Sequence, residues 1–167
     1  MYHRILVAVD NTELSKQAFR KALEIARAFT AKLHIITVCL PLKVEYQDTT
    51  SLAFRDSYYP DLALDLSQKE WDNVGEIGWN LLHSFQQQAK AMGIEAEITQ
   101  QIGRVEEEIT EFARSWNADL IVIGSHGRKG FGELLFGSVS NYVSHHVTCS
   151  VLLVHERKEA NQQPSKL

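Results

Sequence analysis

The sequence predicts an α/β protein whose core is a parallel β-sheet with helices on both faces. Short apolar runs alternate along the chain with longer segments in which apolar residues recur every three or four positions. The runs at 5–9 and 120–123 contain no polar residue, which is typical of strands covered on both faces. Strands that alternate with helices are joined by crossover connections, so the strands are expected to be parallel.

The beginning of the chain supplies two strands and the helix between them. After the strand at 5–9, apolar residues follow a helical period over 14–29, and Thr12 is placed to cap the N-terminus of that helix. The apolar run at 33–38 then predicts the second strand. These three elements form one strand–helix–strand unit.

Residues 41–70 interrupt the alternation. They contain turn-like residues at 47–50, followed by aromatic and leucine side chains without a clear period. A connection of this length inside a compact domain is unusual, and it is often a lid, a partner surface or a mobile insertion. The sequence leaves these interpretations open.

A second helix and an edge strand follow the insertion. Apolar residues keep a helical period over 71–92, and Gly93 is a typical residue to end a helix. The segment 95–101 alternates apolar and polar residues, which predicts a strand with one wetter face at an edge of the sheet.

The last third repeats the alternation. Apolar residues from Val105 to Trp116 predict a helix, and the acidic residues 106–108 in its first turn complement the helix dipole rather than act in catalysis. The strand at 120–123 precedes a helix that opens near Val139, and a strand at 151–154 follows it.

The loop after the strand at 120–123 is the clearest candidate for binding chemistry. It contains Gly124 and Gly127 and, after nine intervening residues, Gly137 followed by Ser138 at the start of a helix. Glycines let main-chain N–H groups approach a ligand closely, and a helix N-terminus adds free donors and the positive end of a dipole. The arrangement therefore predicts a phosphate-binding loop.

Two common phosphate loops do not fit. A Walker loop needs Gly-Lys-Ser/Thr four residues after its first glycine, and no such run is present. The Rossmann fingerprint places its glycines after the first strand, where this chain has Asp10, Asn11 and Thr12.

The segment 124–138 resembles the nucleotide-binding signature of the universal stress protein family, Gly-x2-Gly-x9-Gly-Ser/Thr, with every motif position filled. The likeness covers roughly residues 3–155 apart from the insertion at about 41–70. It implies one domain at 1–155, followed by a polar tail at 156–167 that is expected to be mobile. It also implies a Rossmann-like fold of the adenine nucleotide alpha hydrolase type, with strand order 3-2-1-4-5.

The same resemblance implies that the protein binds ATP or AMP and regulates a stress response; the alternative is a slow ATP hydrolase. No catalytic residue is assigned, because nothing in the glycine loop would activate a water. Asp10 would lie beside the ribose and any Mg²⁺ near the phosphates, and the main chain of Val38 would meet the adenine edge. The residues expected to contact the nucleotide are Ala8, Val9, Asp10, Val38, Gly124, Gly127, Arg128, Gly137, Ser138, Val139 and Ser140.

Other sites fit less well. A phospho-receiver domain needs a pair of acids after the first strand, where Asp10 stands alone, and an ATP pyrophosphatase needs a Ser-Gly-Gly loop there. His145, His146 and Cys149 suggest a metal site, but adjacent helical residues point about 100° apart and no second pair completes a tetrahedron.

Composition restricts the remaining classes. The net charge of −4 over 167 residues argues against nucleic-acid binding, which favours a basic face. The two cysteines, Cys39 and Cys149, are interpreted as buried thiols of a reducing compartment. No apolar stretch is long enough to span a membrane, and the first strand begins too early for a signal peptide.

Location and assembly are predicted from the end of the chain. The expected location is the cytoplasm, with the peroxisome as the alternative in a eukaryote, because the chain ends Ser165-Lys166-Leu167. The last strand has no charge or proline to protect a sheet edge, so we expect a homodimer through Val151, Leu152, Leu153 and Val154. No membrane or nucleic-acid partner is expected, and a regulatory protein partner is left unidentified.

Overall fold

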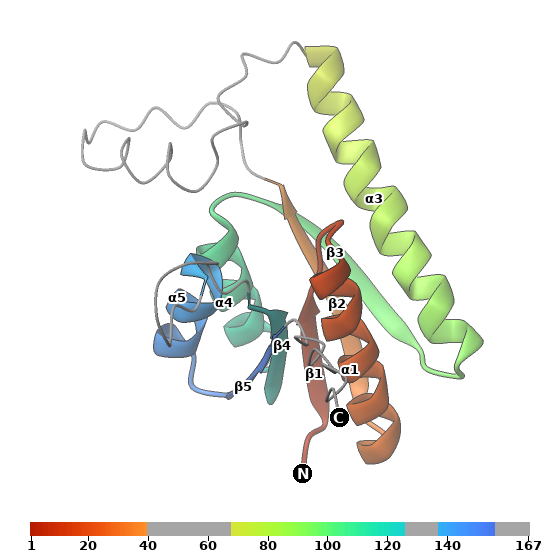
Figure 1. Ribbon diagram of the computed structural model, residues 1–167, viewed down its shortest axis with the longest axis vertical. Coiled ribbons are helices and arrows are strands. Elements are labelled where there is room, and N and C mark those ends of the chain that lie inside the picture. Colours follow the sequence, from red (N-terminus) through yellow and green to blue (C-terminus); the bar gives the residue numbers. More distant parts are fainter. Residues whose placement is uncertain (40–67, 126–136, 156–167) are drawn as a thin grey trace, which may run out of the picture.

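The computed structural model describes residues 1–39, 68–125 and 137–155, with only the backbone described at 68–74 (Figure 1). Most of the predicted insertion and the whole of the tail at 156–167 lie outside the described residues. The elements are β1 (Arg4–Ala8), α1 (Glu13–Phe29), β2 (Lys32–Cys39), α3 (Gln68–Ala91), β3 (Ala96–Ile102), α4 (Val105–Ser115), β4 (Leu120–Gly124), α5 (Ser138–His146) and β5 (Ser150–Val154).

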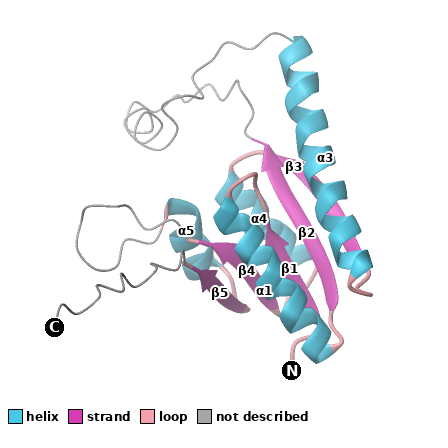
Figure 2. Ribbon diagram, turned by 45° about the vertical axis from the view of Figure 1, so that its right-hand side comes forward, coloured by secondary structure: helices cyan, strands magenta, loops and turns pink. Residues whose placement is uncertain are grey.

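The strands form one parallel sheet in the order β3-β2-β1-β4-β5, which confirms the predicted fold class and strand order. Helices α1 and α3 cover one face of the sheet, and α4 and α5 cover the other (Figure 2). The edge position predicted for the strand after Gly93 is also confirmed, because β3 ends the sheet.

The central strands β1 and β4 are buried on both faces, which explains their unbroken apolar runs. Ile5 and Val7 belong to the core beneath α1 and α3, whereas Leu6, between them in the sequence, belongs to the core beneath α4 and α5. All three side chains are fully buried. Successive side chains of these strands therefore pack into the two cores in turn, because side chains alternate between the faces of a sheet.

Local signals place the ends of two helices as predicted. The Thr12 hydroxyl accepts a hydrogen bond from the Ser15 N–H at 3.2 Å, which caps the N-terminus of α1. Gly93, two residues after the end of α3, has a φ of 75°, in the left-handed region that ends helices. Helix α3 begins at Gln68, three residues before the predicted start.

Among the described residues, no helix combines the length and apolar character that crossing a bilayer requires. Cys39 and Cys149 were predicted to be buried thiols, but each of them is only half-buried. Cys39 is the last residue of β2 and Cys149 immediately precedes β5, so each lies where the sheet meets its loops. Partial burial raises the pKa of both thiols.

His34 is a polar residue inside the apolar strand β2, and it is 5% exposed. Its Nε2 lies 2.8 Å from the Thr99 hydroxyl, and its Nδ1 lies 3.2 Å from a carboxylate oxygen of Glu97. The rings of Phe112 and Trp116 pack at 4.6 Å and 5.2 Å from its centroid. Burial lowers the pKa of His34, and the nearby Glu97 carboxylate only partly opposes this effect.

This lowered pKa predicts a pH-dependent stability. The unfolded chain, with an ordinary His pKa of 6.5, takes up a proton before the folded protein does, so the free energy of unfolding should fall as the pH drops through 6.5 towards the lower folded value. In His34→Gln, which cannot titrate, urea unfolding at about pH 7 and about pH 5 should give more similar free energies than in the wild type.

A second group with a shifted pKa acts in another pH window. Hydrogen bonds from the main-chain N–H groups of His3 and Arg4 lower the pKa of Asp119. The contribution of Asp119 to the free energy of unfolding is therefore lost only below its ordinary pKa of 3.8, outside the range tested for His34.

An equal loss of stability between about pH 7 and about pH 5 in wild type and His34→Gln would contradict the role given to His34.

Candidate functional site

The carboxyl ends of β1 and β4 lie side by side at the point where the strand order reverses. These strands pair directly, with Val7 opposite Val122. Asp10 follows β1 by two residues, and Gly124 is the last residue of β4. Ligands of open α/β sheets bind at such a reversal, beyond the carboxyl ends of the strands. The sheet thus brings together two of the predicted site residues.

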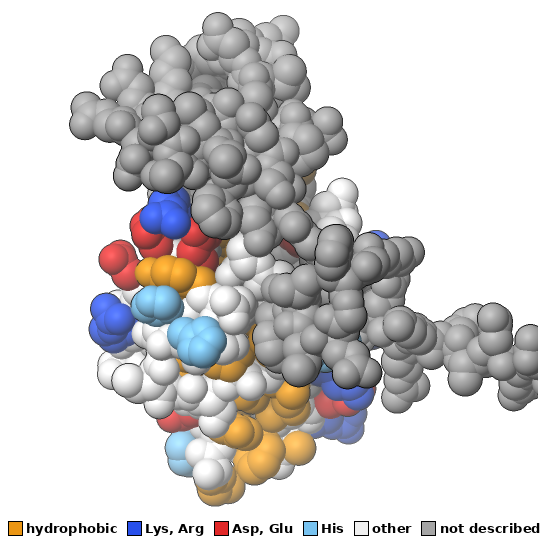
Figure 3. Space-filling model, turned by 60° about the vertical axis from the view of Figure 1, so that its left-hand side comes forward, with side chains coloured by type: hydrophobic (Ala, Val, Ile, Leu, Met, Phe, Trp, Pro, Cys, Tyr) orange, Lys and Arg blue, Asp and Glu red, His pale blue; other side chains and the backbone are white. Residues whose placement is uncertain are grey.

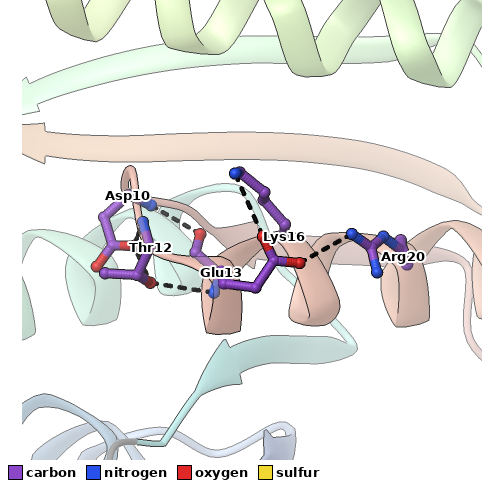
Figure 4. Close-up of polar contacts among 6 residues, drawn as sticks. Asp10, Thr12, Glu13, Lys16 and Arg20 are labelled. Carbon is purple, nitrogen blue, oxygen red and sulfur yellow. Dashed lines mark hydrogen bonds and ion pairs between the residues drawn. The ribbon is translucent and has the colours of Figure 1, made fainter. Parts of the chain in front are cut away.

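The loop from β1 to α1 holds the Asp10 carboxylate in a defined orientation (Figure 4). One of its oxygens accepts hydrogen bonds from the N–H of Thr12 at 2.9 Å and from its hydroxyl at 2.5 Å. The Asp10 N–H donates to the Ser15 hydroxyl at 2.8 Å, and the Ser15 side chain is buried. Asp10 itself is exposed, so its carboxylate is both oriented by its own turn and accessible to a ligand.

Basic side chains lie next to this loop on the first turns of α1. Glu13 pairs with Lys16 at 3.3 Å and with Arg20 at 3.0 Å (Figure 4). The hydrogen bond from Lys16 is the main cause that lowers the pKa of Glu13. The acidic residue nearest to Asp10 is therefore compensated within its own helix.

The main chain of Val38 is directed towards the gap that β1 leaves when it ends. Ile36 accepts a hydrogen bond from the Val9 N–H at 2.9 Å, so its main-chain groups face β1, and those of Val38, two residues further, face the same way. The buried Thr37 hydroxyl donates to the Val9 carbonyl at 2.9 Å, where the chain leaves the sheet. Within the part of the chain that the structure describes, no main-chain hydrogen bond joins Val38 to Val9, and the N–H and C=O of Val38 face this gap.

The N-terminus of α5 differs from those of α1 and α4. Its N-cap residue is Gly137, which has no side chain to accept a hydrogen bond, and its first turn contains no acid. Helix α1 has the Thr12 cap and Glu13, and α4 has acids at 106–108. Of these three helices, α5 alone combines an N-cap residue that makes no side-chain hydrogen bond with a first turn that contains no acidic residue.

Two buried serines join this helix end to the sheet. Ser125 follows β4, Ser140 lies in the first turn of α5, and each is 2% exposed. Their hydroxyl oxygens lie 3.2 Å apart, and the Ser140 hydroxyl donates to the Gly137 carbonyl at 2.9 Å. The Ser140 hydroxyl thus points inwards, which leaves its main chain as the part of Ser140 that could meet a ligand.

The structure explains the need for glycine at one of the two described motif positions, Gly124, but not at the other, Gly137. A Cβ on Gly124 would lie 2.9 Å from Cγ of Leu14, so glycine here lets α1 pack closely against the end of β4. Gly137 has a φ of −57° and a ψ of 154°, which any residue can adopt. Backbone strain therefore does not explain the glycine at 137.

The remaining predicted site residues are placed as follows. Ala8 is half-buried and Val9 is 5% exposed, both next to Asp10. Ser138 is exposed and is the first residue of α5, directly after the N-cap residue Gly137. Gly127 and Arg128 lie outside the described residues.

Neither of two other candidate regions resembles a phosphate site. The His146 ring stacks on Tyr142 at 3.8 Å, and no group of three metal-ligating side chains gathers within the described ranges. A groove of about 390 Å³ lies between α4 and β3, but its lining carries two carboxylates, of Glu108 and Glu111, against the single guanidinium of Arg114, a balance that disfavours phosphate.

Sequence reasoning missed three residues of this region: Ser15, Thr37 and Ser125. Each is a small, buried hydroxyl residue that contacts a main-chain or side-chain group of the predicted site. Ser125 could have been predicted from the sequence, because it lies inside the glycine motif, directly after Gly124.

Comparisons with known proteins agree with this architecture. A sequence profile described as the Universal stress protein family matches residues 1–155. Universal stress protein Sll1388 of Synechocystis sp. is 35% identical over 156 residues, which cover 92% of this chain and 97% of that protein.

Two solved structures share the fold. Universal stress protein UspA from Lactobacillus plantarum is 24% identical, with a TM-score of 0.69 over 92% of this chain and 97% of that one. A universal stress protein in complex with cAMP is 26% identical, with a TM-score of 0.64 over 93% and 99% of the two chains. From the profile match and the identity to the Synechocystis protein, we conclude that the chain belongs to the universal stress protein family.

Proposed function

We propose that the protein binds an adenine nucleotide, ATP or AMP, beyond the carboxyl ends of β1 and β4, and acts as a nucleotide-dependent regulator in a stress response. The observation that carries the proposal is the uncapped, acid-free N-terminus of α5. Ser125 joins it to the end of β4, so it lies at the reversal of strand order. Free N–H donors and a positive dipole end at this position suit a phosphate group.

The rest of the nucleotide would extend from α5 towards β2. Main-chain N–H groups of Gly137, Ser138, Val139 and Ser140 would bind phosphate, with Gly127 and Arg128 contributing from the other part of the motif. Asp10 would accept hydrogen bonds from the ribose hydroxyls, because its carboxylate is exposed and already oriented by Thr12.

The adenine base would lie at the gap between β1 and β2. The N–H and C=O of Val38 that face this gap would form a donor–acceptor pair that matches an adenine edge, and Ala8 and Val9 would supply apolar contacts beside it. The universal stress protein solved with cAMP supports this assignment at the level of ligand class, since cAMP carries adenine, ribose and phosphate.

The residues fit a divalent cation only as part of a nucleotide complex. Mg²⁺ binds oxygen ligands and usually combines one or two carboxylates with phosphate oxygens and water. Asp10 supplies one exposed carboxylate at this edge. When bound, Mg²⁺ would neutralise phosphate charge, and this chain would contribute Asp10 as its ligand.

Calorimetry with ATP and AMP tests the proposal. A hydrogen bond to a charged group contributes roughly 1.5–3 kcal/mol, so several of them, after the cost of association, predict a dissociation constant on the order of micromolar. Absence of binding at about millimolar nucleotide would contradict the proposal. Rapid multiple turnover of ATP that is lost in Asp10→Ala would instead place the protein among the hydrolases.

We also propose that residues 1–155 form one cytoplasmic domain that dimerises through β5. The Ser150 N–H donates to the Asp119 carbonyl, and the Val154 carbonyl accepts from the Ser125 N–H, so main-chain groups of residues 150, 152 and 154 face β4. Those of Val151 and Leu153 consequently face outwards. Figure 3, which brings the side carrying β5 forward, shows hydrophobic side chains reaching the surface in its lower part.

A further inference from the structure

We propose that Ser125 and Ser140 are a positioning pair that holds the phosphate-binding end of α5 against the sheet. This inference rests on the proposed nucleotide site and assigns a role to residues that would not touch the nucleotide through their hydroxyls. Both side chains are 2% exposed, so their hydroxyl groups are inaccessible to a phosphate.

The hydroxyls form a directed chain of hydrogen bonds. The Ser140 hydroxyl has one proton and donates it to the Gly137 carbonyl at 2.9 Å. In the 3.2 Å contact between the two serine hydroxyls, Ser125 must then be the donor. The chain therefore runs from Ser125 through Ser140 to the main chain of the N-cap residue of α5.

Ser125 is itself fixed to two strands. It directly follows β4, and its main-chain N–H donates to the Val154 carbonyl of β5 at 2.8 Å. A residue held in this way is a rigid anchor, because moving it would break a main-chain hydrogen bond. Through the two hydroxyl hydrogen bonds, Ser125 at one end of the glycine motif holds the N-terminus of α5 at the other end.

Loss of the serine pair should affect the binding of phosphate and not the binding of adenosine. Ser138 and Val139 lie between the two helix residues that the chain holds, Gly137 and Ser140, so the direction of their N–H groups depends on it. Asp10 and Val38 are positioned instead by Thr12, Ser15 and strand pairing. Breaking the serine pair should therefore weaken phosphate contacts and leave adenosine contacts unchanged.

The test compares ATP, AMP and adenosine binding in Ser125→Ala and in Ser140→Ala. We expect the ATP affinity to fall by about tenfold in each variant, while the adenosine affinity stays within about twofold of the wild type. In the double variant the loss should be no larger than in the single ones, because one hydrogen-bonded unit is already broken.

Ser144→Ala is the matched control. Its hydroxyl also lies on α5 and donates to the Ser140 carbonyl at 2.7 Å, but Ser144 is exposed, and the hydroxyl that meets Ser125 is that of Ser140. This variant should keep the ATP-to-adenosine affinity ratio of the wild type. A merely structural role of Ser125 would lower the melting temperature and weaken both ligands in parallel, which would overturn the inference.

Amide exchange in the nucleotide-free protein gives a second readout. Exchange at Asn141, whose N–H donates to the Gly137 carbonyl at 2.9 Å, should be faster in Ser125→Ala than in Ser144→Ala, because the first turn of α5 loses the hydrogen bonds that hold it. If the wild type binds no nucleotide, the proposed function fails, and this measurement alone decides the role of the pair. Unchanged exchange, or an unchanged affinity ratio in a wild type that does bind ATP, would overturn the positioning role.

Discussion

Replacing Gly137 by Asp is expected to abolish nucleotide binding and, at the same time, to raise the free energy of unfolding. The φ of −57° and ψ of 154° at this N-cap position suit Asp, whose carboxylate would accept hydrogen bonds from the uncapped first turn of α5. A better cap together with a negative charge at the positive end of the dipole should add roughly 0.5–1 kcal/mol of stability.

The same carboxylate would occupy the proposed phosphate site. It would take the N–H donors and repel an anion, so calorimetry should show a loss of ATP affinity of at least about 100-fold. Denaturant unfolding measures the gain in stability on the same protein. Few substitutions in a binding site stabilise the fold, so the two opposite effects together are a specific signature.

Two further variants separate charge from bulk. Gly137→Asn should cap the helix about as well but carry no charge, so it should weaken binding less than Gly137→Asp does. Gly137→Val should obstruct the site without capping the helix, and so lose affinity without gaining stability. Wild-type ATP affinity in Gly137→Asp would show that phosphate binds elsewhere.

Local sequence signals predicted the elements whose structural causes are local. The apolar runs of β1 and β4 identify central strands because both faces of those strands are buried. Thr12 caps α1, and Gly93 ends α3 in the left-handed region, where its missing Cβ avoids strain. The order of the strands came from the family resemblance, because periodicity carries no information on which strands pair.

Features that depend on distant contacts could not be predicted. His34 interrupts an apolar strand, and its partners Glu97 and Thr99 lie more than sixty positions away, on β3. Ser125 and Ser140 look like ordinary loop and helix residues until the fold brings their hydroxyls together. Even Gly124, a motif residue, has a packing reason that appears only once Leu14 of α1 lies over it.

Placing Pro at Leu153 should convert the proposed dimer into a monomer that keeps its fold. The N–H of Leu153 faces the open edge of β5, so Pro removes a donor from the dimer interface without removing a hydrogen bond to β4. Proline is tolerated on an edge strand where its missing N–H would face solvent. Sedimentation at about 50 µM should show the mass of a dimer for the wild type and of a monomer for the variant.

The neighbouring residue provides the control for this argument. Leu152 has its main-chain groups facing β4, so Leu152→Pro should break the ladder inside the monomer and lower its melting temperature. Leu153→Ala keeps the outward N–H and should remain largely dimeric, which separates loss of the main-chain donor from loss of the side chain. A wild type that is already monomeric, or a Leu153→Pro variant that stays dimeric, would exclude pairing along β5. Because main-chain groups along β5 face β4 and the open edge in turn, proline at Leu153 should disrupt the dimer and proline at Leu152 should destabilise the monomer. A general loss of stability would not produce this difference between adjacent leucines.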